Sequence, residues 1–420
     1  MPKMYPGFAT TRPSASNHLA IFAMTAMRKR PTAYLWVLMA SCAVLAIPGY
    51  ARDDPRPYIA VIEAPQVVVD KELDRLGIDE LMKRLKVPGV SIAVVHDFKI
   101  HWAKAYGVAD QTSGRAVDTR TRFQSASISK PVTAMAAMCL VQQNKLDLDA
   151  DANTFLKSWK IPTASWTRTQ AVTPRSLLSH TSGADDGFGF PGYKPNVPLP
   201  STVQILDGKA PSNVGKVNFS RVPYQQYKYS GGGLIVMQVA MSDLTGQPFA
   251  QLMQQTVLSP LGMTRSTYES SSDDAANNAA AHDKLGQGKD APWHIYPEQA
   301  AASLWTTPTD LAKFIVELQT GLRGPRGTLL GQGSAREMVT PVGVGPYGLG
   351  LVVSKRGQGW YFTHGGDNWG YRAWMIGHLR KGYGYVIMTN GDNGAAIIAV
   401  LADRIAQAYD WDSVDKPIAP

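Results

Sequence analysis

Apolar residues recur along this chain at two different spacings. In the segment VSIAVVHDFKIHWAKAYGVAD, residues 90–110, two β-rich runs flank Asp97-Phe98, which predicts two strands joined by a tight turn. The late segments WYFTH, YRAWMIGHL and YGYVIMTNG predict further strands. Apolar runs at helical spacing, with local cap and turn signals, predict helices over 127–146, 173–183, 234–246, 307–321 (capped by Thr309 or Asp310) and 394–411.

The order of these segments predicts the layers of the fold. Strands come early and late, and helices with loops fill the middle. The economical arrangement is an α+β fold, in which both ends of the chain share one antiparallel sheet flanked by helices and the middle forms a mainly helical insertion. We expect residues 52–66 to be a polar linker, the sheet part to comprise 67–126 and 300–420, and the helical part to comprise 127–299. Residues 184–223, rich in Gly, Pro and Asn, are expected to form a long functional loop.

The first 51 residues have the form of a leader. Three basic residues follow Met27, and an apolar run over 33–47, short for a membrane span, comes next. Cleavage is expected after Ala51, which predicts a signal peptide over 1–51 and an exported protein, periplasmic or secreted, without stable membrane insertion. Met24 or Met27 would give a better leader than Met1, and an uncleaved anchor is the alternative.

Composition and charge exclude several classes of protein. A chain of 420 residues with 44% hydrophobic content can bury a large core. The net charge is +9, but five of these charges lie in residues 1–51 and no basic stripe follows, so a nucleic-acid partner is not expected. The two cysteines are Cys42 and Cys139. Cleavage would leave only Cys139, expected to be a buried thiol, and no intrachain disulfide.

The motifs give no reason to expect a metal or a cofactor. The segment DLDADAN, 147–153, resembles a calcium loop, but Ala152 stands where such a loop needs glycine. The segment GVGPYG, 343–348, fits a dinucleotide pattern, yet it leads into an expected strand instead of a helix. The histidines lack metal-ligand spacing, and no G-x-S-x-G nucleophile elbow occurs. The oligomeric state stays open.

The strongest chemical signal is the pair Ser127 and Lys130 in SASISKPVTA. On a helix, positions three apart share a face, and a lysine freed of water can lose its proton and serve as a base. Pro131 is tolerated only near a helix start, which locates the pair there. Taken alone, the pair favours a capping serine beside a solvated lysine, because serine is common at helix N-caps.

Two later segments reverse this preference and favour the chemical interpretation. In YKYSGGG, Tyr229 follows the irregular stretch and precedes a helix. In FTHGGDNWG, His364, Gly365 and Gly366 come at the end of an expected strand. Glycines beside a nucleophile allow a substrate to approach the backbone closely.

The ordered set of motifs resembles the serine β-lactamase and penicillin-binding protein superfamily, in its class C β-lactamase, DD-peptidase and esterase branch. The similarity runs from about Pro88 to about Asn393 and rests on these segments in order: PGVSIAVV, FQSASISKPVTAM, LDLDADANTFL, RSLLSHTSG, YSGGG, AASLWTTPTDLAKF, YGLGLVV and HGGDNWGYR. No single segment is specific, but their shared order is.

The resemblance implies a role for each motif. Ser127 would be the nucleophile that forms an acyl-enzyme, Lys130 would help to deprotonate it, and Tyr229 would relay a proton to the leaving group. His364, Gly365 and Gly366 would form the third motif of the family. The backbone N–H groups of Ser127 and Asp367 would form the oxyanion hole.

Two departures from the family pattern bear on the substrate. Gly231 stands where the second motif commonly has asparagine, and His364 stands where many members have lysine. Neutral histidine binds a substrate carboxylate weakly. We therefore expect an esterase or amidase with a small-molecule, peptide or ester substrate. The alternatives are a β-lactamase or D-Ala-D-Ala carboxypeptidase and, from another class, a penicillin-recognising or cell-wall-binding protein with little turnover.

Overall fold

The computed structural model describes residues 54–66, 72–186, 189–269, 275–324 and 329–413. The predicted signal peptide lies outside these ranges. The chain from Pro55 onward forms one compact unit. Within it, the predicted α+β layering is confirmed.

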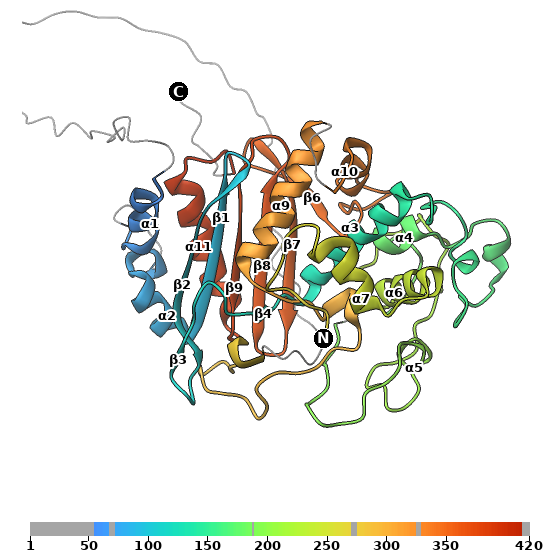
Figure 1. Cartoon of the computed structure of the whole chain (residues 1–420), viewed down its shortest axis with the longest axis horizontal. Helices are drawn as coiled ribbons and strands as arrows, with labels where there is room; N and C mark the ends of the chain where they lie inside the picture. The colour runs from blue at the N-terminus through green and yellow to red at the C-terminus, as the bar shows by residue number, and fades with distance from the viewer. Residues whose placement is uncertain (1–53, 67–71, 187–188, 270–274, 325–328, 414–420) are drawn as a thin grey trace, which may run out of the picture. The chain divides into compact units, whose positions relative to one another are not determined.

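A seven-stranded antiparallel sheet runs through the middle of the unit (Figure 1). Its strands come from the two ends of the described chain, in the spatial order β3-β2-β1-β9-β8-β7-β6. Because β1 pairs with β9, the early and late strands join directly, as the sequence predicts. The strands are β1 Gly89–His96, β2 Lys99–Asp110, β3 Arg115–Ala116, β6 Val352–Arg356, β7 Gly359–Asn368, β8 Tyr371–His378 and β9 Gly384–Thr389; β4 Phe123–Gln124 and β5 Trp305–Thr306 form a separate pair.

The predicted hairpin is present. Asp97 and Phe98 both have positive φ, at 50° and 61°, which suits the tight turn between β1 and β2. Along β1, Val94 packs with the helices of one sheet face and Ala93 with those of the other. This alternation explains why the central strands are apolar at nearly every position, since both of their faces are covered.

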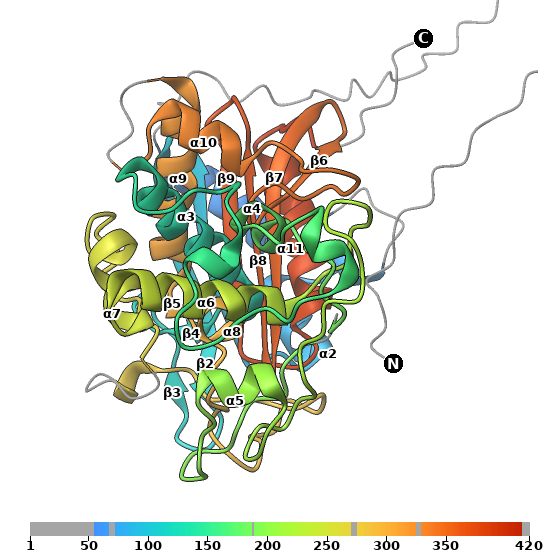
Figure 2. The same cartoon turned by 90° about the vertical axis from the view of Figure 1, so that its right-hand side faces the viewer.

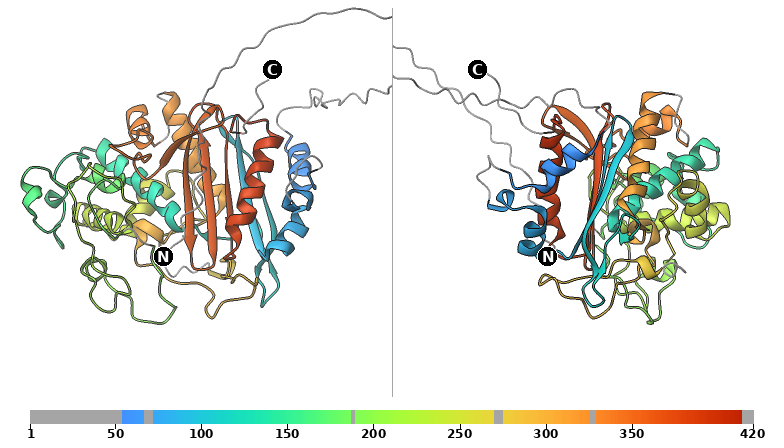
Figure 3. Two further views of the ribbon diagram at one scale, coloured as in Figure 1. Left: turned by 180° about the vertical axis from the view of Figure 1, so that it is seen from behind. Right: turned by 60° about the vertical axis from the view of Figure 1, so that its left-hand side comes forward.

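One face of the sheet carries α1 Arg56–Glu63, α2 Ile78–Leu85 and α11 Gly394–Ala408, and Figure 3 shows them on the side opposite to α9. The prediction of a linker over 52–66 was therefore wrong for most of that segment. Pro57 is tolerated in the first turn of α1, and Ile62 is fully buried against the rest of this layer. Arg404 of α11 donates to the carbonyl oxygen of Ile62 at 3.2 Å, which holds α1 in place.

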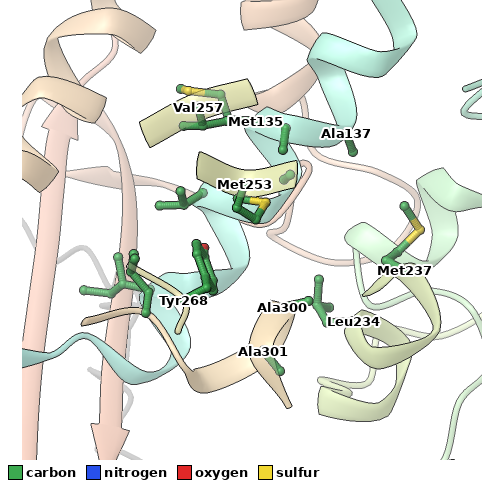
Figure 4. Packing of buried hydrophobic residues seen from close by; sticks show 14 of the residues in the cluster. Met135, Ala137, Leu234, Met237, Met253, Val257, Tyr268, Ala300 and Ala301 are labelled. Carbon is green, nitrogen blue, oxygen red and sulfur yellow. The ribbon is translucent and has the colours of Figure 1, made fainter. Parts of the chain in front are cut away.

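The other face carries α9 and the helices of the middle segment (Figure 2). Figure 4 shows Met135 of α3 near Met253 of α7 and Tyr268, in the core that supports α3. The helices of this layer are α3 Ser129–Gln142, α4 Pro174–Leu178, α5 Thr202–Asp207, α6 Gly231–Thr245, α7 Phe249–Met253, α8 Gln299–Ala302, α9 Pro308–Arg323 and α10 Gln332–Met338; a 3₁₀ turn, η2 Ala126–Ile128, precedes α3.

Three local predictions need correction. The stretch 184–223, expected to be irregular, contains α5. The N-cap of α9 is Thr307, whose side chain accepts from the backbone N–H of Asp310, because Pro308 occupies the first turn. Strand β7 does not end at the His-Gly-Gly motif but continues to Asn368, because β8 pairs with it that far.

Over the residues that the structure describes, we find no helix long and apolar enough to cross a membrane.

Candidate active site

Ser127 and Lys130 meet where η2 joins α3. The Lys130 amino group donates to the Ser127 hydroxyl oxygen at 3.0 Å and to the carbonyl oxygen of Ala301 at 2.8 Å. Ala126, immediately before the serine, has φ 51°, a strained value for a residue with a β-carbon. The two predicted residues are thus in contact, and α8 supplies a third group through its backbone.

The Lys130 side chain is removed from water. It is 2% exposed, and burial lowers its pKa from 10.5 to about 7, while the negative charge of Asp186 opposes this shift. At neutral pH a large fraction of Lys130 is therefore unprotonated and can accept a proton from Ser127.

Tyr229 lies beside this pair, just before α6. The Lys130 amino nitrogen is 5.0 Å from the centroid of the Tyr229 ring. Burial raises the pKa of the Tyr229 phenol, and a hydrogen-bonding contact with Ser127 partly opposes the rise. The phenol is therefore protonated at neutral pH and can pass a proton only when a neighbour supplies one in return.

Asp186 anchors the start of α6, next to Tyr229. Its carboxylate accepts from the Ser230 hydroxyl and, at 2.6 Å, from the backbone N–H of Gly232. A negative charge is favourable at a helix N-terminus. Gly232 has no room for a β-carbon, which would lie 2.5 Å from Val217 and 3.0 Å from the carboxylate carbon of Asp186.

His364 comes from β7 and is 3% exposed. Its Nδ1 lies 2.7 Å from the carbonyl oxygen of Gly365, which assigns the proton to Nδ1 and leaves a lone pair on Nε2. The Nε2 atom is buried and has no hydrogen-bond partner among the residues that the structure describes. Burial and the nearby charge of Lys130 lower the pKa of His364 to about 3, so the ring is neutral at pH 7.

Gly366 brings β7 against η2. A β-carbon on Gly366 would lie 2.1 Å from the carbonyl oxygen of Ser125, so only glycine allows this approach. The pairing of β6 with β7 ends at Thr363. Beyond it, no described strand pairs with this edge of β7, which lies against η2, while β8 still pairs with the other edge. The backbone of Asp367 lies on this stretch, whereas its carboxylate pairs with Arg372 at 2.9 Å.

The residues Ser127, Lys130, Tyr229 and His364 therefore lie together, with Gly366 at the contact between β7 and η2. Gly365 does not point towards these residues. A β-carbon on Gly365 would point to the opposite face of the sheet, where it would lie 2.9 Å from the Trp374 ring. The sequence analysis missed four neighbours of the site: Asp186, His180, Tyr227 and Tyr347. His180 stands in RSLLSHTSG, one of the segments on which the family resemblance rests. The resemblance could therefore have pointed to His180, although it does not say what the residue does.

Among the described residues, no group of three or more His, Cys, Asp or Glu side chains could hold a metal ion.

The family of proteins described as Beta-lactamase matches residues 77–410 of the chain. The chain belongs to the beta-lactamase family. It is 28% identical to penicillin-binding protein 4 of Amycolatopsis lactamdurans over 331 residues, which cover 74% of this chain and 83% of that protein. It is 28% identical to esterase EstB of Burkholderia gladioli over 192 residues, which cover 44% of this chain and 48% of that protein. The chain spans less than half the length of EstB and of other curated relatives that it matches.

The fold is also shared with solved structures. The D-amino acid amidase of Ochrobactrum anthropi SV3 superposes with a TM-score of 0.63 and 21% identity, covering 84% of this chain and 98% of that one. At this identity the likeness shows the fold, a β-lactamase-like α+β architecture. The proteins to which this chain is similar thus include ones named as an esterase, an amidase and a penicillin-binding protein.

Proposed function

We propose that this protein is a serine hydrolase that works through an acyl-enzyme on Ser127, with esters or amides as substrates. The observation that carries the proposal is the contact at 3.0 Å between the Ser127 hydroxyl and a buried Lys130 whose pKa is about 7. A buried lysine with this pKa can take a proton near neutral pH, which an ordinary surface lysine cannot do.

The reaction proceeds in two halves. Neutral Lys130 accepts the proton of Ser127 as its oxygen attacks the substrate carbonyl carbon, and the backbone N–H groups of Ser127 and Asp367 stabilise the oxyanion. Tyr229 then gives its proton to the leaving group and takes the serine proton from Lys130, as the bond from the carbonyl carbon to that group breaks. In the second half, water attacks the acyl carbon and gives one proton to neutral Lys130. That proton passes to the Ser127 oxygen as its bond to the acyl carbon breaks, which releases the acid and restores the neutral lysine.

The charges at the site favour a neutral substrate over an anionic one. His364 offers a lone pair on a neutral ring, which accepts a hydrogen bond from an amide or hydroxyl group and repels a carboxylate oxygen. Asp186 adds a negative charge nearby. These features favour an esterase or amidase over a β-lactamase or D-Ala-D-Ala carboxypeptidase, and the printed names of EstB and the D-amino acid amidase are consistent with this choice.

The proposal includes export of the protein, which rests on the leader pattern of residues 1–51. Fractionation of cells that express the full chain, with N-terminal sequencing of the product, tests it. A mature N-terminus after Ala51 in the exported fraction supports export, and an uncleaved chain in the cytoplasm contradicts it.

The substrate class is tested with a matched pair of peptides. The first peptide, N-acetyl-D-Ala-D-Ala, carries a free carboxylate beside the scissile bond. The second is the same peptide with its C-terminus amidated, which is neutral at that position. We expect the wild type to hydrolyse the neutral peptide faster, and His364→Lys to shift the ratio of the two kcat/KM values towards the carboxylate by about tenfold or more. A wild type that prefers the free carboxylate, or rapid turnover of nitrocefin, would instead favour the alternative functions.

The mechanism itself is tested with p-nitrophenyl butyrate and the variant Ser127→Ala. Turnover by the wild type and none by the variant supports the acyl-enzyme. If Ser127→Ala keeps full activity, the mechanism is wrong. If the wild type is labelled by a fluorescent penicillin but turns over no substrate, the protein is a penicillin-recognising protein.

A further inference from the structure

His180 occupies a strained and fully enclosed position next to the site. It follows α4, is 1% exposed, and has φ 60°, a left-handed value that is uncommon for a residue with a β-carbon. Such strain persists only where surrounding contacts hold it, and it concentrates at functional positions. The contacts that hold His180 include several with the segment that carries Tyr229.

His180 binds the chain on both sides of Tyr229. The backbone N–H of Lys228 donates to the His180 carbonyl oxygen at 2.9 Å, and the backbone N–H of Ser230 donates to the Nδ1 atom of its ring at 3.1 Å. The His180 ring also lies against the Tyr229 ring, with 4.3 Å between the centroids. One residue thus contacts the backbone on both flanks of Tyr229 and the ring of Tyr229 itself.

The hydrogen bonds also assign the protonation of His180. Because Nδ1 accepts from Ser230, the neutral ring carries its proton on Nε2. Within the described ranges Nε2 is buried without a hydrogen-bond partner, and the ring meets the Tyr347 ring edge-on with 4.8 Å between the centroids. Burial, the positive charge of Lys130 and the neighbouring His364 lower the pKa of His180 well below its usual value. The ring therefore stays neutral and keeps its acceptor for Ser230.

We propose that His180 is a positioning residue that holds the Tyr229 phenol in place for proton transfer to the leaving group. This inference rests on the proposed function, in which Tyr229 gives a proton to the leaving group, and it adds His180 as the residue that holds Tyr229 in position. Proton transfer needs the donor within hydrogen-bond reach of the leaving atom, and a displacement of about 1 Å can lower the rate about a hundredfold.

The leaving group of the substrate separates this role from a structural one. A p-nitrophenolate leaves without being protonated, whereas the alkoxide of a methyl ester needs a proton from Tyr229. His180→Ala should therefore lower kcat for methyl butyrate by about 10- to 100-fold and for p-nitrophenyl butyrate much less. Tyr229→Phe should show the same selectivity, and adding His180→Ala to it should change kcat for methyl butyrate by less than about twofold, because the positioned group is already gone.

Two further substitutions separate the side chain from the strained backbone. His180→Asn tolerates the left-handed conformation and supplies an amide oxygen for the Ser230 N–H, so it should recover part of the lost activity. His180→Gly tolerates the left-handed conformation better still but supplies no acceptor for the Ser230 N–H, so it should not recover the lost activity.

His282 is the matched control. It is also fully buried and also contacts backbone groups, since its ring accepts from the N–H of Gln111 and lies 2.9 Å from the carbonyl oxygen of Asn390. His282→Ala should lower Tm without changing the ratio of kcat values for the two esters.

The outcomes distinguish failure of this inference from failure of the proposed function. Equal loss on both esters in His180→Ala, or full additivity with Tyr229→Phe, would overturn the positioning role while Ser127→Ala still abolishes turnover. Full activity in Ser127→Ala would overturn the proposed function whatever the His180 variants do.

Discussion

The amino nitrogen of Lys130 and the hydroxyl oxygen of Ser127 are 3.0 Å apart in a part of the fold that excludes water from the lysine. Two histidines near this pair, His180 and His364, are neutral because burial lowers their pKa values. Of these three groups, only Lys130 titrates near neutral pH, so the activity should follow its protonation.

The pH dependence of activity should have a single acid limb. The pKa of Lys130 is lowered to about 7, so the form that accepts the serine proton increases as pH rises. We expect kcat/KM for p-nitrophenyl butyrate to rise about tenfold from about pH 6 to about pH 8 and then level off. A profile that is flat over this range would contradict Lys130 as the base.

Removing the buried amine should stabilise the protein while it destroys activity. Lys130 has a lower pKa in the folded state than in the unfolded state, so between about pH 7 and about pH 10 the unfolded chain binds more protons. The cost of burying the charged lysine therefore disfavours folding, and it falls as pH rises through this range. Lys130→Met, of similar length, should raise Tm at pH 7 and abolish turnover. Its advantage in Tm should shrink as pH rises from 7 towards 10, because the lysine then loses its proton in the unfolded state too. Thermal unfolding followed by circular dichroism measures both effects, and an advantage that grows with pH would contradict the argument.

The close approach of β7 to η2 predicts an asymmetric effect of two adjacent glycines. A β-carbon on Gly366 would meet the backbone oxygen of Ser125 at 2.1 Å and would push the Asp367 backbone away from Ser127. Gly366→Ala should lower kcat about 10²–10³-fold, as expected when one oxyanion donor is lost. Gly365→Ala presses instead on the Trp374 ring, on the opposite face of the sheet, and should cost mainly stability. Equal kcat values for the two folded variants would contradict this placement of the oxyanion hole.

Asp186 should set the position of the acid limb. Its negative charge raises the pKa of Lys130 against the effect of burial. Asp186→Asn removes that charge, so the pKa of Lys130 should fall further and the acid limb of kcat/KM should move to lower pH. A limb that stays in place, or that moves to higher pH, would contradict this effect of the Asp186 charge on Lys130.

The spacing of apolar residues along the sequence was sufficient to predict the strands and helices that have a regular hydrophobic period. The hairpin at Asp97-Phe98 was predicted because turn residues separate two apolar runs, and α3 because its apolar positions have helical spacing. The same reasoning failed at α1, where prolines suggested a linker. The burial of Ile62 that stabilises this helix depends on α11, more than 300 residues away.

For the site, the sequence by itself determined which reactive groups the chain carries and their order: Ser127, Lys130, Tyr229 and the His-Gly-Gly segment. It could not determine their state. Only the tertiary structure buries Lys130 enough to lower its pKa, brings Gly366 against Ser125, and places Asp186 and His180 around Tyr229. The reason is physical, because a pKa and a proton-transfer distance depend on solvent exclusion and on neighbours from distant segments, and neither quantity exists in the unfolded chain.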